Sequence, residues 1–265
     1  MGMIHLTPWD LALAALLVLL LALMSWRLHL GVERRILIAA ARSTVQLMLV
    51  GLVLKVLFAQ TSLPLIGLMA MVMLSAAGFE VMQRQKRRYR GIWGYGIGAF
   101  SMFLSSFTVT VLALNLVIGV EPWYQPQYLI PLLGMLLGNT MNGVAIALEN
   151  LTRQAWESRG RIEARLLAGG TWEQAIGDIR RDALRSGLIP IVNAMGSAGL
   201  VSLPGMMTGQ ILAGSPPLEA AKYQLLIMFL ISGGTGLGSV AAVWLGSRRL
   251  FDERQRLRLD RLRTV

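Results

Sequence analysis

The sequence contains no cysteine and only two histidines, His5 and His29, among its 265 residues. The absence of cysteine excludes a disulfide framework and any metal site built from thiolates. Both histidines lie near the ends of long apolar runs, which excludes a histidine-based transition-metal site within a membrane span. The sequence also lacks the Gly-x4-Gly-Lys-Ser/Thr pattern that holds nucleotide phosphates, so we expect no ATP site in this chain.

Charged residues are scarce, at 15% of the chain, whereas soluble domains have roughly 25%. Hydrophobic residues make up 55%, and they gather in runs long enough to cross a bilayer, which takes about 20 residues of helix. The composition therefore predicts an all-α, polytopic membrane protein that forms one transmembrane domain over residues 1–265. We predict seven spans, at residues 9–26, 36–58, 63–82, 92–120, 128–148, 188–213 and 219–245.

The net charge of +11 comes from arginines that cluster beside the ends of the predicted spans. This distribution follows the positive-inside rule, so it predicts orientation in a membrane and not nucleic-acid binding. Loops 60–62, 121–127 and 215–217 contain no Lys or Arg and are expected outside. The N-terminus is therefore predicted outside, and residues 248–265 form a basic cytoplasmic tail.

Residues 151–187 separate the fifth and sixth predicted spans and read as a cytoplasmic hairpin of two short amphipathic helices. Gly169 and Gly170 are expected to end the first helix, and Thr171 with Gln174 forms a capping box for the second. Apolar residues then share one face of that helix. Two interpretations stay open, a face that docks into a partner's groove and a helix that lies on anionic lipid.

Within this hairpin, Glu163-Ala164-Arg165 followed by Gly169 resembles the Glu-Ala-Ala…Gly coupling motif of ATP-binding-cassette (ABC) permeases, with Arg165 in place of the second alanine. In those permeases the motif helix inserts into a groove of the ATPase subunit. The resemblance implies coupling to an ATPase through Glu163, Ala164, Gly169, Gly170, Trp172 and Ile176.

A broader resemblance covers most of the chain. The longest segment is Gly-Leu-Val-Ser-Leu-Pro-Gly-Met-Met-Thr-Gly at 199–209, and shorter ones lie at 41–46, 53–55, 130–131, 134–139, 213–214 and 221–224. In order and spacing these segments are similar to the FetB-type permease family. The resemblance implies a homodimeric permease of the bacterial inner membrane that binds a separate FetA-type ATPase, which holds the ATP and Mg²⁺. Members of this family are associated with iron export, and plant relatives with aluminium tolerance.

Polar residues within the fifth and sixth spans are candidates for a substrate path. Asn139 and Asn142 share one face, and Glu149 continues it toward the inner end. Their oxygens could bind a hard cation, or they could form hydrogen bonds between helices. The complete set is Asn139, Asn142, Glu149, Asn193, Met206 and Met207; no specific metal ligand set is predicted.

Three residues are predicted to interrupt the sixth span: Pro190, Pro204 and Gly205. Proline removes a backbone hydrogen bond and kinks or breaks a helix. We expect a kink or re-entrant break around residues 203–207 beside the path, or alternatively an outer loop followed by a short helix.

These observations favour a non-catalytic permease subunit that exports a metal ion, with iron as the first candidate and energy from a cytoplasmic ATPase. A metal channel or secondary transporter would need no nucleotide. A membrane scaffold or sensor would dock a soluble partner without any substrate flux.

Overall fold

The computed structural model describes residues 7–59 and 62–264. It is almost entirely helical, and the described part contains six helices that are long and apolar enough to cross a membrane. Contacts divide the chain into two compact units, one formed by residues up to 62 with 212–214 and one by the remainder. The predicted loop at 60–62 falls largely on Gln60 and Thr61, which lie outside the described residues, as does His5.

The first unit contains α1 (Pro8–Arg27) and α2 (Glu33–Ala59), which match the first two predicted spans. Thr7 caps α1, because its hydroxyl accepts the Asp10 N–H while the Asp10 carboxylate accepts the Thr7 N–H at 2.7 Å. Gly31, at φ +68°, supplies the left-handed backbone between the helices. Most side chains of α1 and α2 are exposed and apolar, as lipid-facing helices require.

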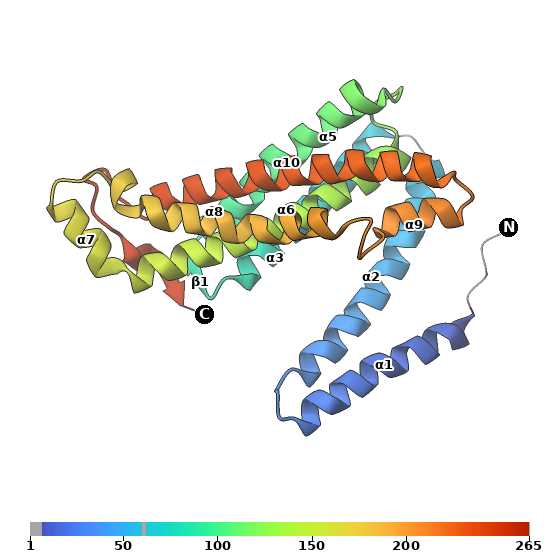
Figure 1. The fold of residues 1–265 in the computed structure, drawn as a ribbon, viewed down its shortest axis with the longest axis horizontal. Helices are drawn as coiled ribbons and strands as arrows, with labels where there is room; N and C mark the ends of the chain where they lie inside the picture. The colour runs from blue at the N-terminus through green and yellow to red at the C-terminus, as the bar shows by residue number, and fades with distance from the viewer. Residues whose placement is uncertain (1–6, 60–61, 265) are drawn as a thin grey trace. The chain divides into compact units, whose positions relative to one another are not determined.

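The second unit has a core in which α6, α8 and α10 lie side by side (Figure 1). Gly143 of α6 and Gly187 of α8 permit this close approach, since a Cβ on Gly187 would lie 2.7 Å from the Gly143 carbonyl oxygen. The helices are α3 (Leu63–Arg84), α4 (Trp93–Met102), α5 (Thr108–Leu112), α6 (Pro126–Glu157), α7 (Arg159–Leu167), α8 (Trp172–Ser197), α9 (Gly205–Leu212) and α10 (Pro217–Arg249). Two π-helical segments, η1 (Phe103–Phe107) and η2 (Ala113–Ile118), join α4 and α5 into one span, 93–118.

The predicted sixth span, 188–213, is not one helix. Helix α8 ends at Ser197, residues 198–204 form an irregular segment, and α9 begins at Gly205. Gly199 has φ +83°, and its N–H donates to the Ser202 carbonyl at 2.9 Å, which closes a tight turn. The break begins upstream of the predicted 203–207, and the short helix that follows it matches the second of the two predicted arrangements.

Pro190 does not interrupt α8, contrary to the prediction. A proline inside a helix forfeits one backbone hydrogen bond and strains the preceding turn. Here Ala183, Gly187 and Ile191 are buried on both sides of Pro190, and α8 packs extensively against α6. This packing holds the helix continuous across the proline. Pro204, in contrast, does lie at a helix boundary, immediately before α9.

The predicted hairpin begins later than expected and joins its neighbours without interruption. Residues 151–157 continue α6, because Leu151 and Ala155 extend the buried face of that helix and no glycine or proline intervenes. The first arm is therefore only α7, and the second arm runs on as α8 into the predicted sixth span.

The basic tail is folded and not extended. Strand β2 (Leu262–Thr264), preceded by a 3-10 turn, η3 (Leu259–Arg261), pairs antiparallel with β1 (Arg87–Tyr89) in the loop between α3 and α4 (Figure 1). Leu250, Phe251 and Leu262 are buried, which anchors the segment. This small sheet was not predicted, because three-residue strands carry no hydrophobic period of their own.

Candidate functional site

The turn between α7 and α8 has the predicted local structure. Gly169 adopts φ +88°, a conformation that favours glycine, and the Gly170 N–H donates to the Arg165 carbonyl at 3.1 Å. The capping box is also confirmed: Gln174 N–H donates to Thr171 Oγ1 at 3.4 Å, and Thr171 N–H donates to Gln174 Oε1 at 3.0 Å. Together these bonds satisfy the end of α7 and the start of α8.

Arg165 clamps the two arms together. Its guanidinium donates to Asp178 Oδ1 at 2.8 Å and to the Ala175 carbonyl at 3.1 Å, so α7 is tied to the first and second turns of α8. The hydrogen bond from Arg165 holds the pKa of the Asp178 carboxyl below its ordinary value of 3.8. In the sequence, Arg165 was noted only because it replaces an alanine of the coupling motif. The one feature that could have predicted this ion pair is the presence of opposite charges, Arg165 and Asp178, on the two sides of the Gly169 turn.

The apolar face of α8 is buried within the chain and is not open to a partner. Ala175, Ile176, Ile179 and Ala183 are all at most 1% exposed. Ile176 therefore cannot touch an ATPase directly, contrary to the prediction, although it supports the hairpin from inside. The sequence correctly predicted an apolar face on this helix, but the same chain covers that face and leaves it closed to a partner.

The hairpin tip is exposed instead. Glu163, Ala164 and Gly169 face solvent, and Leu167 is 89% exposed. A large apolar side chain this exposed at the end of a charged hairpin suits an interaction surface. Trp172 is half-buried. Its ring lies 5.7 Å from that of Phe251, and its backbone N–H donates to Gln255 Oε1 at 3.0 Å.

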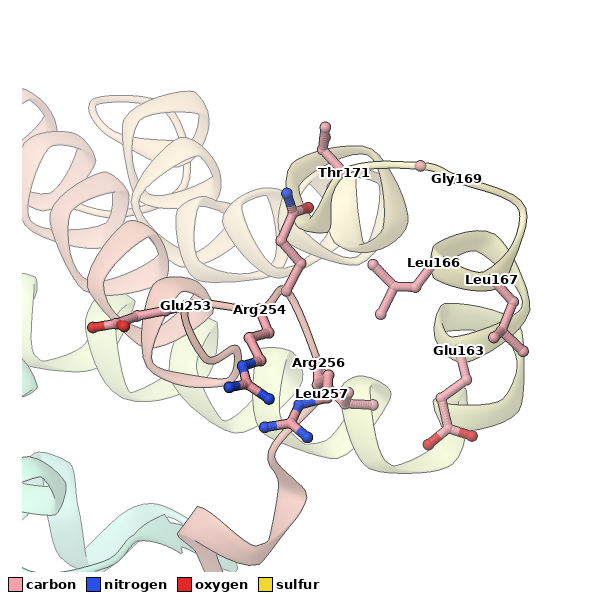
Figure 2. A pocket seen from close by; sticks show the side chains of 11 residues that line it. Glu163, Leu166, Leu167, Gly169, Thr171, Glu253, Arg254, Arg256 and Leu257 are labelled. Carbon is pink, nitrogen blue, oxygen red and sulfur yellow. The ribbon is translucent and has the colours of Figure 1, made fainter.

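The C-terminal segment completes this surface. A cavity of about 680 Å³ separates the α7–α8 turn from residues 253–257. Figure 2 shows Glu163 and Leu167 on the α7 side and Arg254, Arg256 and Leu257 on the other. Sequence reasoning missed this contribution, since no local pattern connects residues 253–257 to the hairpin.

Asp252 shapes the returning segment. Its carboxylate accepts the Arg256 N–H at 2.8 Å and the Arg254 N–H at 3.0 Å, and it pairs with the Arg256 guanidinium. The Arg256 N–H is the main cause of a lowered pKa at Asp252. Gln255, between these two arginines, adopts φ +57°, which is uncommon outside glycine and directs its amide toward Trp172.

The predicted path residues of α6 are engaged in structural bonds. Asn139 donates to the Met135 carbonyl of its own helix at 2.8 Å. Asn142 accepts from the Arg84 guanidinium at 2.5 Å, and Glu149 accepts the Lys86 N–H at 2.8 Å. Asn142 and Glu149 thus join α6 to the end of α3 and the loop after it.

The other path candidates lie apart from these. Asn193 is exposed on α8, and Met206 and Met207 are half-buried on α9. In the part of the chain that the structure describes, no hydrogen bond joins Asn193 to Asn139 or Asn142, and no three His, Cys, Asp or Glu side chains gather as metal ligands would. A substrate role for these residues stays a prediction.

Comparison with known proteins gives the chain a family. Residues 8–251 match the model of an uncharacterised protein family, UPF0014. A UPF0014 membrane protein of Synechocystis is 40% identical over 89% of this chain and 90% of its own length. The probable iron export permease protein FetB of Escherichia coli is 32% identical over 98% of both chains, and the protein ALUMINUM SENSITIVE 3 of Arabidopsis thaliana is 33% identical over 88% of this chain and 83% of its own. No solved structure matches. The resemblance to the FetB-type permeases is therefore confirmed, and the chain belongs to the UPF0014 family of membrane proteins.

Proposed function

We propose that this membrane permease is the transmembrane subunit of an ABC transporter that exports a metal ion, with iron the first candidate. The observation that carries the proposal is the exposed α7–α8 tip, with Leu167 and Glu163 beside a cavity closed by residues 253–257. A relative of nearly the same length bears the name of a probable iron export permease. In this proposal the chain is non-catalytic and a FetA-type ATPase supplies the ATP site and Mg²⁺.

The geometry suggests how a push at the tip would travel. The Arg165–Asp178 bond makes α7 and the start of α8 move together. Helix α8 then runs unbroken for 26 residues, about 39 Å at the rise of an α-helix, to the irregular segment 198–204. Beyond that segment lies α9 with Met206 and Met207. Movement of the tip would therefore be delivered at the break in the predicted sixth span.

The proposal includes a homodimer in the inner membrane, with the α7–α8 tip and the C-terminal segment in the cytoplasm. The arginines of both elements support this orientation. Exposed apolar faces on α1, α2 and elsewhere are what lipid or a second copy would cover.

The test is binding and stimulation of a FetA-type ATPase by the purified permease in lipid vesicles. Glu163→Ala and Leu167→Ser should each weaken ATPase binding by about tenfold, the effect expected of a central contact residue. Glu157→Ala is the control, because Glu157 is also an exposed glutamate but pairs with Arg153 within α6 and does not line the cavity. Equal loss in the control, or full binding by both tip variants, would contradict a docking role for the tip.

The substrate is tested in the same vesicles. ATPase activity is titrated with Fe(II), Fe(III), Al(III), Cu(I) and Zn(II), together with a metal-free sample. Selective stimulation by iron supports iron as the substrate, and accumulation of iron on the side of the membrane opposite the ATPase supports export. Metal flux that persists without nucleotide would replace the ABC proposal with a channel or secondary transporter, and partner binding without any flux would indicate a scaffold.

A further inference from the structure

A second cavity, of about 660 Å³, lies at the ends of two spans and is lined by tryptophan and arginine. Trp93 begins α4, and Trp244, Arg248 and Arg249 end α10; Arg261 of the returning C-terminal segment closes the cavity. All of these residues belong to the second unit. The ends that meet here are the ones where arginines gather, so the cavity sits where a span passes from hydrocarbon to headgroups.

The cavity carries a net positive charge, because three arginines line it against two acids, Asp252 and Glu253. Neither Arg248 nor Arg249 forms an ion pair with any residue that the structure describes. Arg261 donates to the carbonyls of Arg249 at 2.9 Å and Phe251 at 3.1 Å, which fixes its guanidinium beside the other two. The nearest acid in the lining, Asp252, is already paired with Arg256 and Arg258. Glu253 is the other lining acid, and it is exposed.

Tryptophan rings support two of these arginines. The Arg249 guanidinium lies 4.7 Å from the centre of the Trp93 ring, and that of Arg248 lies 5.6 Å from the centre of Trp244. Stacking on an indole holds a guanidinium in place while its N–H groups remain available to an anion. Trp93 and Trp244 are 43% and 42% exposed, so both rings reach the surface, as interfacial tryptophans do.

We propose that this cavity, formed by Trp93, Trp244, Arg248, Arg249 and Arg261, binds the headgroup of an anionic phospholipid. The shared chemistry is a phosphate diester, whose oxygens accept paired N–H bonds from guanidinium groups. The lipid source is favoured because two interfacial tryptophans form the wall, and because basic cavities between spans on this side of a membrane bind anionic headgroups. The inference is independent of the proposed transport function.

The cavity also reaches the hairpin. Trp172, the first residue of α8, lies in its wall. A headgroup bound there would contact the ends of α4 and α10 and the start of α8 together. It would therefore brace the element that carries the exposed tip.

The experiment is native mass spectrometry of the purified full chain in detergent, titrated with phosphatidylglycerol or with phosphatidylcholine of the same acyl chains. Phosphatidylglycerol should bind about tenfold more tightly. The preference should be lost in the Arg248→Gln/Arg249→Gln double variant and retained in Arg181→Gln, which removes one exposed positive charge from outside the cavity.

The single variant Arg248→Gln guards against misfolding, because this side chain is exposed, lies against the Trp244 ring and forms no hydrogen bond or ion pair with any described residue. It should reduce the preference by about threefold while leaving the thermal unfolding of the protein unchanged. Equal affinity for the two lipids, or equal loss in Arg181→Gln, would overturn the proposal. Binding of glycerol 3-phosphate at millimolar concentration, with no preference for phosphatidylglycerol over phosphatidylcholine, would overturn the lipid source and indicate a site for a soluble phosphate.

Discussion

The two halves of α8 differ in what holds them. From Trp172 to Gly187 the helix is capped, clamped by Arg165 and buried along one face by Ala175, Ile176, Ile179 and Ala183. From Leu188 to Ser197 most side chains are exposed, and Ile191 is the one buried residue. One continuous helix thus has a rigid end near the exposed tip and a sparsely packed end near the break at 198–204. Such a helix can transmit movement of the tip, because residues 188–197 have few contacts within the chain to hold them in place.

Replacing Gly187 should produce the largest effect on the packed half. A Cβ at this position would lie 2.7 Å from the Gly143 carbonyl oxygen and 2.9 Å from the Ala147 side chain, so α6 and α8 must separate. We expect Gly187→Ala to lower the free energy of unfolding by about 1–3 kcal/mol, measured by thermal unfolding in detergent. Gly177→Ala is the control, because nothing lies within 4 Å of its added Cβ and alanine favours a helix by roughly 0.5–1 kcal/mol. Destabilisation by both variants would contradict a specific close approach.

Arg165→Gln tests the clamp at the start of the same half. The Arg165–Asp178 pair is partly exposed and therefore screened by solvent, so we expect a smaller loss of stability than in Gly187→Ala. Hydrogen exchange of residues 159–178 should accelerate, while residues 188–197 stay unchanged. Arg161→Gln serves as control, since Arg161 lies 3.6 Å from Asp178 in a weaker pair. Unchanged exchange in Arg165→Gln would show that α7 is held by other contacts.

The same clamp predicts a dependence on pH. The pKa of Asp178 is lowered in the folded hairpin, chiefly by the Arg165 hydrogen bond, so its stabilising contribution is present above the unfolded value of about 3.8 and is lost as the pH falls through the folded value. NMR titration of labelled aspartate should find the pKa of Asp178 below 3.8. Arg165→Gln should raise the pKa of Asp178 toward its ordinary value, and no change there would exclude the clamp as its cause.

Replacing Gln255 should change the stability of the protein in two opposing ways, through a lost hydrogen bond and through relief of backbone strain. Gln255→Ala loses the bond to the Trp172 N–H but keeps φ at +57°, whereas Gln255→Gly loses the same bond and removes the backbone strain. We expect the glycine variant to be more stable than the alanine variant by about 1 kcal/mol. Thermal unfolding of the two proteins measures the difference, and equal stability would mean that the turn relaxes.

Asn193 should matter least for stability. Its side chain is exposed in the sparsely packed half, so Asn193→Ala should change the free energy of unfolding by less than about 0.5 kcal/mol. If Asn193 lies on the substrate path, the metal concentration that half-stimulates the partner ATPase should rise nevertheless. A change in stability without a change in metal response would place Asn193 in packing.

Local signals in the sequence predicted local structure well. Thr171 with Gln174 and the Gly169 turn lie within a few residues of one another, so spacing alone specifies their hydrogen bonds. The apolar runs likewise predicted six of the spans, because the length and hydropathy of a span are properties of its own residues and do not depend on its neighbours.

Features that depend on distant neighbours were not predictable in the same way. Ile176 sits on an amphipathic face, but the sequence does not say whether a partner or the same chain covers that face. Pro190 carries a breaking signal that packing against α6 overrides. Residues 253–257 lie beside the hairpin because β2 pairs with β1, and no local pattern in the sequence predicts that pairing.

Strand β1 precedes α6, α8 and α10 in the chain and its partner β2 follows them, so the loop carrying Arg87 and Arg88 is synthesised well before the strand that pairs with it. During that interval the backbone of the loop is unpaired, and its arginine side chains can meet anionic headgroups, an interaction that disfavours moving a loop across a membrane. Pairing with β2 can follow only after α10 has been synthesised. The small sheet can therefore fix the position of this loop only after its arginines have influenced the orientation of the spans.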